Sequence, residues 1–232
     1  MRKITVECLK APAMGKRNVE VVERKGLGHP DTICDSIMNE VSVQLCKEYM
    51  DNFGRVLHHN TDKSLLVVGG VEHAFGGGKV LEPMKLIFGD RACYGAEGKT
   101  IDVEHIAEKA AHDWFRKNMR FVDPNLHVRC QNEIKPGSAE LVDIFNRKTG
   151  KFLPANDTSA AVGYAPMSET EALVFQLEKF FNSKEFKKRH PESGEDIKVM
   201  GMRKGDDLNF TVAMGFVEQF VDSEASYFKK KY

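Results

Sequence analysis

Residues 23–35 read ERKGLGHPDTICD and lead from a glycine-containing loop directly into a helix. The helix is predicted by apolar side chains that recur every four residues: Ile33, Ile37, Val41 and Leu45. Pro30 falls where proline is tolerated in a first turn, and Gly54 lies beyond the expected end. This loop and helix are the best-defined part of the sequence, and the other elements are placed around them.

The rest of the chain mixes extended and helical segments. Strands are expected over residues 3–8, 18–22, 65–70, 81–88 and 127–134, with a hairpin made of residues 197–203 and 208–217. Helices are expected over residues 102–119 and 138–145, from a capping box at Ser168 and Glu171 onward, and after Asp222. Hairpins beside long helices indicate an α+β fold with helices on one face of the sheets.

The composition is that of an ordinary globular protein. Of the 232 residues, 41% are apolar and 29% are charged, and the net charge of zero predicts no general attraction to nucleic acid or to a membrane. Five widely spaced cysteines without a CxxC pair argue against a disulfide framework or a structural zinc site. Without a signal peptide or a long apolar run, we expect a cytoplasmic protein.

The first candidate site is the loop of residues 26–31. Its glycines allow close approach to a ligand, while His29 and Asp31 stand at a helix start, where an anion is favoured. A carboxylate beside a phosphate site commonly holds Mg²⁺. The spacing alone fits equally a loop histidine at His29 and a helix cap at Asp31.

Other motifs are weaker. Residues 75–79 (FGGGK) could cradle a phosphate or form a lid, but they lack the Walker A pattern, and a glycine-rich hairpin turn is favoured. His58 and His59 would point to opposite faces of a strand, so they are not expected to bind one metal ion together. Cys34 is typical of a core residue rather than a nucleophile.

Several segments, in order along the chain, resemble the motifs of archaeal-type methionine adenosyltransferases (S-adenosylmethionine synthetases). They are residues 23–35, 58–62, 68–70, 75–78, 155–159, 162–166 and 195–201. The resemblance implies an enzyme that joins L-methionine to ATP and cleaves the expelled triphosphate to phosphate and pyrophosphate. It also implies Mg²⁺ and K⁺ as cofactors, although no K⁺ ligand can be matched here.

The resemblance also implies roles for single residues. His29 matches the histidine at the breaking C5′–O bond, Asp31 a Mg²⁺-binding aspartate, and Lys198 a lysine on the triphosphate. The implied substrate-binding residues are Gly28, Asn156 and Asp157, the last near the methionine amino group.

One position distinguishes branches of the family. Bacterial and eukaryotic members carry lysine after the His-Pro-Asp motif, whereas this chain has Thr32, as the archaeal branch does. The missing phosphate-binding charge has to come from elsewhere, and four residues are candidates: Arg24, Lys25, Lys63 and Lys79. Of these, Lys63 and Lys79 are the predicted cofactor-binding residues.

The family fold implies three α/β repeats and subunits that pack sheet to sheet as a homodimer or a higher homo-oligomer. Residues 1–120 would form the first repeat and residues 121–232 the second, interleaved with it, while a third repeat is absent from this sequence. We therefore expect little synthetase activity from the chain alone. The alternative is a truncated, non-catalytic nucleotide-binding or structural partner subunit.

Overall fold

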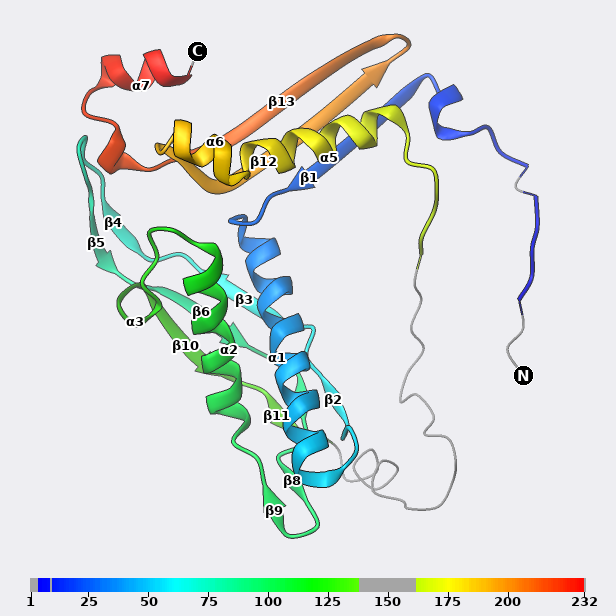
Figure 1. The fold of residues 1–232 in the computed structure, drawn as a ribbon, viewed down its shortest axis with the longest axis vertical. Coiled ribbons are helices and arrows are strands. Elements are labelled where there is room, and N and C mark those ends of the chain that lie inside the picture. Colours follow the sequence, from blue (N-terminus) through cyan, green and yellow to red (C-terminus); the bar gives the residue numbers. More distant parts are fainter. Residues whose placement is uncertain (1–3, 9, 138–161, 232) are drawn as a thin grey trace.

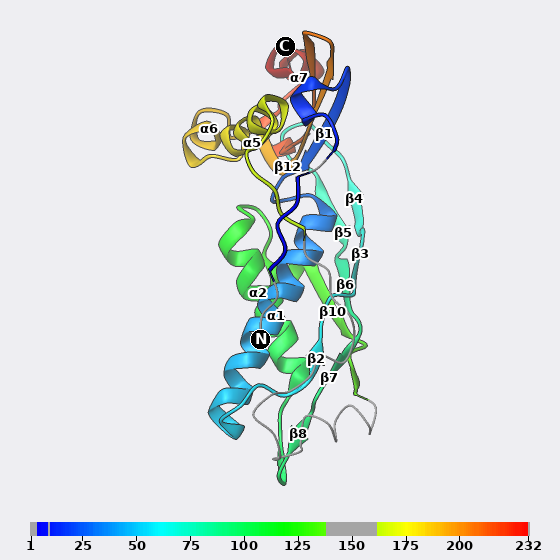
Figure 2. The same cartoon turned by 90° about the vertical axis from the view of Figure 1, so that its right-hand side faces the viewer.

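The computed structural model describes residues 4–8, 10–137 and 162–231. Three of its sheets have three strands. Two of these carry helices, and Figures 1 and 2 show them as two layers joined end to end. In Figure 2 the helices of both layers lie on the same side, and the sheets turn their other face the opposite way. The predicted α+β fold with helices on one face is confirmed.

Helix α1 (Pro30–Phe53) follows the sequence pattern closely. Proline occupies its first turn, and Gly54 ends it in the left-handed conformation with a φ of 67°. The predicted stripe is buried along its whole length: Ile33, Ile37, Val41 and Leu45. Each such side chain contributes roughly 1.5–3 kcal/mol of burial free energy, so α1 holds the first layer together.

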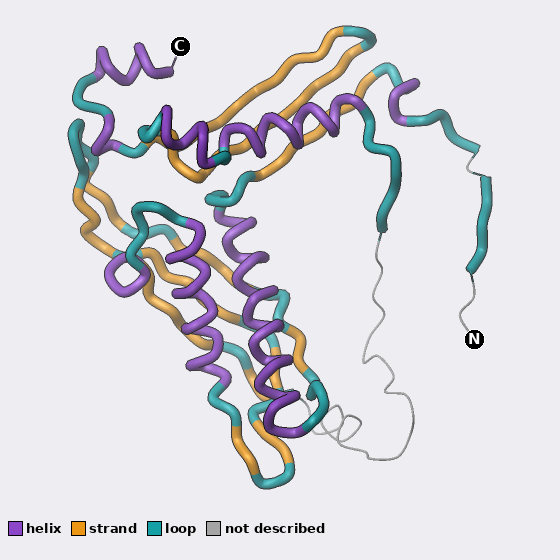
Figure 3. Tube along the Cα trace, in the orientation of Figure 1, coloured by secondary structure: helices purple, strands orange, loops and turns teal. Residues whose placement is uncertain are grey.

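The first layer is a sheet covered by α1 and α2 (Val103–Asn118), which lie side by side in Figure 3. Its strands, in spatial order, are β10 (Val128–Asn132), β6 (Met84–Phe88) and β3 (Ser64–Val67). Strand β10 runs parallel to β6, whereas β3 is antiparallel to it.

The second layer is built from segments near the two ends of the described chain. Strand β1 (Val19–Lys25) pairs antiparallel with β12 (Ser193–Lys204), which forms the expected hairpin with β13 (Asp207–Phe216). Helices α5 (Glu169–Phe181) and α6 (Lys184–Arg189) belong to this layer. Strand β1 leads directly into the loop before α1, so that loop lies where the two layers meet (Figure 1).

The remaining elements are short. They are the strands β2 (His59–Asn60), β4 (Gly70–Glu72), β5 (Lys79–Glu82), β7 (Arg91–Ala92), β8 (Gly95–Ala96), β9 (Lys99–Thr100) and β11 (Lys135–Pro136), and the helices η1 (Met14–Lys16), α3 (Pro124–His127), η2 (Glu218–Phe220) and α7 (Glu224–Lys231). Among the described helices, none combines the length and the apolar character that crossing a membrane requires.

Some predicted elements were wrong. Residues 4–8 are not a strand: they pair with no other strand in the described chain, and Val6 is 91% exposed. The strand predicted at 81–88 is divided at Pro83, which has no amide hydrogen for a sheet ladder. Strand β3 ends at Val67 and is half-buried on one face and exposed on the other. The helix predicted at 138–145 lies outside the described residues.

Candidate active site

Two glycines bring the loop before α1 against the backbone of β12. The amide of Gly26 donates to the carbonyl oxygen of Ile197 at 2.6 Å, and the amide of Gly28 donates to that of Glu195 at 2.9 Å. A Cβ atom on Gly28 would lie 2.5 Å from the carbonyl carbon of Glu195 and 2.6 Å from the amide nitrogen of Asp196. Because these are backbone atoms, close packing requires glycine here. The loop, and with it the start of α1, is fixed on β12.

His29 is the N-cap residue of α1. Its Nδ1 accepts a hydrogen bond from the amide of Asp31, with 3.2 Å between the nitrogens. A neutral imidazole carries one proton, so an accepting Nδ1 places that proton on Nε2. His29 therefore caps the helix and keeps an N–H donor at Nε2. The cap reading of Asp31 is wrong, because the capping side chain is that of His29.

Asp31 projects from the first turn of α1 with 60% of its side chain exposed. Its Oδ2 accepts a hydrogen bond from Nζ of Lys25, and this hydrogen bond holds the pKa of the Asp31 carboxyl below its usual value. An ionised carboxylate is a suitable ligand for a hard cation. Together with Asp35 and Ser64, Asp31 lines a pocket of about 360 Å³ between α1 and β3.

Lys198 lies on β12, directly beside this loop. It pairs across the strands with Lys25, the last residue of β1, so both side chains lie on the same face of the sheet. The Nζ of Lys198 is 3.3 Å from Oε2 of Glu23. The structure thus brings four predicted residues together, namely Gly28, His29, Asp31 and Lys198.

The other predicted residues lie elsewhere. Lys63 follows β2, and its Nζ is 2.7 Å from Oδ2 of Asp62. Lys79 is exposed and begins β5, directly after the turn of the hairpin that β5 forms with β4. Asn156 and Asp157 lie outside the described residues. The described site therefore consists of the residues proposed for metal and triphosphate, without those proposed for methionine.

The weaker motifs have structural explanations. The glycine-rich segment is a hairpin turn, in which Gly76 and Gly77 have φ values of 81° and 134°. Cys34 is buried in the hydrophobic core of the first layer, as expected. His59 lies within hydrogen-bond distance of Ser42 Oγ, 2.8 Å away, and burial lowers the pKa of His58.

Sequence reasoning missed the partner of Arg24. Its Nε donates to Oε2 of the buried Glu178 at 2.7 Å, and its guanidinium lies 4.7 Å from the ring centre of Phe175. Arg24 therefore faces α5, on the other side of the sheet from Lys25. The alternation of side chains along a strand could have revealed this difference, had the strand been extended to Lys25.

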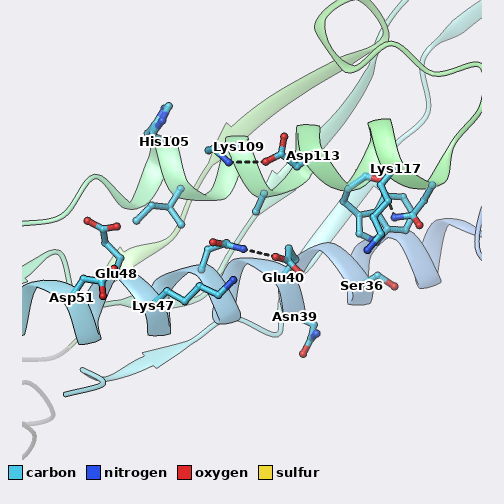
Figure 4. A pocket seen from close by; sticks show the side chains of 15 residues that line it. Ser36, Asn39, Glu40, Lys47, Glu48, Asp51, His105, Lys109, Asp113 and Lys117 are labelled. Atoms are coloured by element: carbon cyan, nitrogen blue, oxygen red, sulfur yellow. Dashed lines mark hydrogen bonds and ion pairs between the residues drawn. The ribbon is translucent and has the colours of Figure 1, made fainter. Parts of the chain in front are cut away.

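A larger pocket, of about 750 Å³, lies between α1 and α2 (Figure 4). Its lining carries charges of both signs, among them Glu40, Lys47, Glu48, Asp51, Lys109, Asp113 and Lys117. Lys109 and Asp113 already form an ion pair of 2.7 Å within α2. None of the predicted site residues lines this pocket, so it is not the place to which the sequence motifs point.

The sequence matches known proteins over its whole length. Residues 2–232 match the family model described as S-adenosylmethionine synthetase (AdoMet synthetase). The chain is 44% identical to a "Probable S-adenosylmethionine synthase" of Aquifex aeolicus, with 100% of this chain and 58% of the relative covered. It is 43% identical to an "S-adenosylmethionine synthase" of Methanothermobacter thermautotrophicus, with 100% and 57% covered. The chain thus spans little more than half the length of these relatives.

A solved structure gives the same fold. The structure entitled "Structure of an Unusual S-adenosylmethionine synthetase from Campylobacter jejuni" matches with a TM-score of 0.51 over 87% of this chain and 49% of that one. At 16% identity this likeness supports the fold alone. The family match and the relatives confirm the resemblance found in the sequence motifs. The chain belongs to the S-adenosylmethionine synthetase family.

Proposed function

We propose that this chain provides the metal- and triphosphate-binding part of a methionine adenosyltransferase, which forms S-adenosylmethionine from ATP and L-methionine. The observation that carries the proposal is the convergence of His29, Asp31 and Lys198 at the start of α1. These are the residues for which the sequence motifs implied contacts to the leaving group, and they come from two distant parts of the chain.

The reaction requires little acid–base chemistry, because a thioether sulfur is already a nucleophile. As the sulfur attacks C5′, the C5′–O bond breaks and negative charge grows on the triphosphate. The Nε2–H of His29 donates a hydrogen bond to the departing oxygen, and the ammonium of Lys198 stabilises the phosphate oxygens. Asp157 and Asn156 would orient methionine, and Lys63 and Lys79 would add charge from neighbouring elements. Water then hydrolyses the triphosphate to phosphate and pyrophosphate.

The residues at the start of α1 suit Mg²⁺. This ion keeps several waters and is usually bound through one or two carboxylates together with substrate phosphates. Asp31 and Asp35 supply two carboxylates on one pocket, with the exposed Asp31 able to reach a bound ligand. When bound, Mg²⁺ would offset the charge of the triphosphate. A requirement for K⁺ rests on the family resemblance alone.

The exposed face of the two sheets supports a homodimer or a higher homo-oligomer. Opposite the helices, this face presents apolar side chains that are 40% exposed or more, namely Val19, Val21, Leu65, Val67 and Met202. Several exposed apolar side chains on one face of a sheet are typical of a protein interface. We expect a second copy to pack on it, sheet against sheet. We also expect the enzyme to be cytoplasmic. Its two repeats, residues 1–120 and 121–232, would be interleaved through β1 and β10.

The proposal is tested by a chimera in which residues 1–232 replace the matching part of the Methanothermobacter thermautotrophicus relative. With ATP, methionine, Mg²⁺ and K⁺, the chimera should form S-adenosylmethionine. His29→Ala and Asp31→Asn should each lower turnover by roughly a hundredfold or more. The melting temperature should stay nearly unchanged in Asp31→Asn and fall only slightly in His29→Ala, which loses the helix cap. His105→Ala and Asp113→Asn, both on α2, are the matched controls and should remain active.

Two results would contradict the proposal. A folded chimera without S-adenosylmethionine formation would favour the non-catalytic partner subunit. Full turnover in both the His29 and Asp31 variants would place the chemistry elsewhere.

A further inference from the structure

Lys25 and Lys198 form an unusual pair. In the register of β1 and β12 they stand directly opposite each other, on the sheet face turned away from α5. Like charges in directly opposed positions destabilise a sheet. Two lysines in this arrangement gain most when an anion lies between or above them.

Each lysine of the pair is neutralised by a carboxylate. Lys25 donates to Asp31, the proposed metal ligand, and Lys198 lies beside Glu23. Both side chains remain accessible, since 37% of Lys25 and 41% of Lys198 is exposed. The partner of Lys25 is thus one of the two carboxylates proposed to bind the metal ion.

The other candidates for the missing phosphate-binding charge are less well placed. Arg24 is on the opposite face of β1, held by the buried Glu178. Lys63 is paired with Asp62, and Lys79 belongs to the β4–β5 hairpin. Of the four, Lys25 alone adjoins both Asp31 and Lys198.

We propose that Lys25 is a second triphosphate-binding cation, which Asp31 holds by an ion pair until Mg²⁺ takes over the carboxylate. The inference rests on the proposed function and names a further residue of the same site. As Asp31 turns to the metal, the ammonium of Lys25 pairs with a phosphate oxygen beside Lys198. Metal and triphosphate then bind cooperatively. The metal ion frees Lys25 for the triphosphate, and the triphosphate frees Asp31 for the metal ion.

The test is calorimetric titration of residues 1–232 with inorganic triphosphate, in Mg²⁺ and in EDTA. In Mg²⁺, Lys25→Gln should weaken binding by roughly tenfold, a typical effect of removing one partly exposed charge contact. Lys25→Arg should restore most of the affinity, because it keeps the cation. The matched control is Lys109→Gln, which removes a lysine from a similar exposed ion pair with aspartate (Figure 4) and should change nothing.

A double-mutant cycle isolates the exchange of partners. In EDTA, Asp31→Asn should bind triphosphate several-fold more tightly than the unmodified chain, because Lys25 is released. That gain should disappear when Lys25→Gln is also present. In Mg²⁺ the effect of Asp31→Asn should reverse and binding should weaken.

The outcomes separate the inference from the function. Mg²⁺-dependent binding that is unaffected by Lys25→Gln would overturn the role of Lys25 and leave the proposed function standing. If Asp31→Asn still tightens triphosphate binding when Lys25→Gln is also present, the gain comes from removing a negative charge and not from releasing Lys25. That result would also overturn the inference. If the unmodified chain binds no triphosphate in Mg²⁺, the proposed binding site itself fails, and the inference with it.

Discussion

Replacing Gly28 with alanine tests the fixation of the loop on β12. The added Cβ would lie 2.5 Å from the carbonyl carbon of Glu195, whereas unstrained carbon contacts are about 3.5–4.0 Å. The loop or the strand must therefore shift by roughly 1 Å, and neither contact atom is the end of a flexible side chain. Such a shift would also stretch the hydrogen bond of 2.9 Å from the Gly28 amide to Glu195.

The expected loss of stability follows from these contacts. Overpacking costs about 1–3 kcal/mol and a weakened hydrogen bond about 1 kcal/mol, whereas the stiffer unfolded chain returns about 0.4–1 kcal/mol. Gly28→Ala should therefore lower the free energy of unfolding by about 1–3.5 kcal/mol. It should also weaken triphosphate binding, because His29 and Asp31 follow directly in the chain.

The assay is urea unfolding followed by circular dichroism, with Gly15→Ala as the matched control. A Cβ on Gly15 meets nothing within 4 Å, so this variant should stay within about 0.5 kcal/mol of the unmodified chain. A Gly28→Ala variant with unchanged stability would show that the loop is not packed on β12 as described.

Three further predictions concern the sheet face and the interior. Val21→Lys should shift the protein towards monomers in light scattering coupled to size-exclusion chromatography, and an unchanged mass would contradict the sheet-face interface. Tyr49→Phe should lower the free energy of unfolding by about 1–2 kcal/mol, because the buried hydroxyl donates to the Cys93 carbonyl oxygen at 2.7 Å; equal urea midpoints would refute this. Burial lowers the pKa of Lys187 from 10.5 to about 8, so its neutral form is favoured in the fold. The free energy of unfolding, relative to Lys187→Met, should therefore rise as the pH increases from about 8 to about 10.5, and a falling difference would contradict this burial.

Local sequence patterns predicted the elements that local forces determine. The four-residue stripe and the flanking Pro30 and Gly54 gave α1 nearly to the residue, and the capping box at Ser168 gave the start of α5. Residues 4–8 failed because alternation alone does not provide a neighbouring strand. Apolar alternation favours a strand, but pairing with a neighbour decides whether one forms.

Long-range pairing was beyond the sequence patterns. Nothing local indicates that β1 pairs with β12, more than 160 residues later, with Lys25 opposite Lys198. The motifs located His29, Asp31 and Lys198 through family resemblance. Their spacing alone fitted equally a loop histidine at His29 and a helix cap at Asp31. Which of the four candidate cations adjoins Asp31 depends on the face to which each side chain points, and hence on the strand's exact extent.

The most direct test of the central claim locates the metal. Mn²⁺, added with inorganic triphosphate to isotopically labelled residues 1–232, broadens the NMR signals of nearby amides. The strongest broadening should fall on Asp31 and its neighbours in α1 and on Lys198 in β12, and Asp31→Asn should abolish it. Broadening centred instead on Asp62 and Asp90, whose carboxyl groups contact each other, would contradict the assignment of the site.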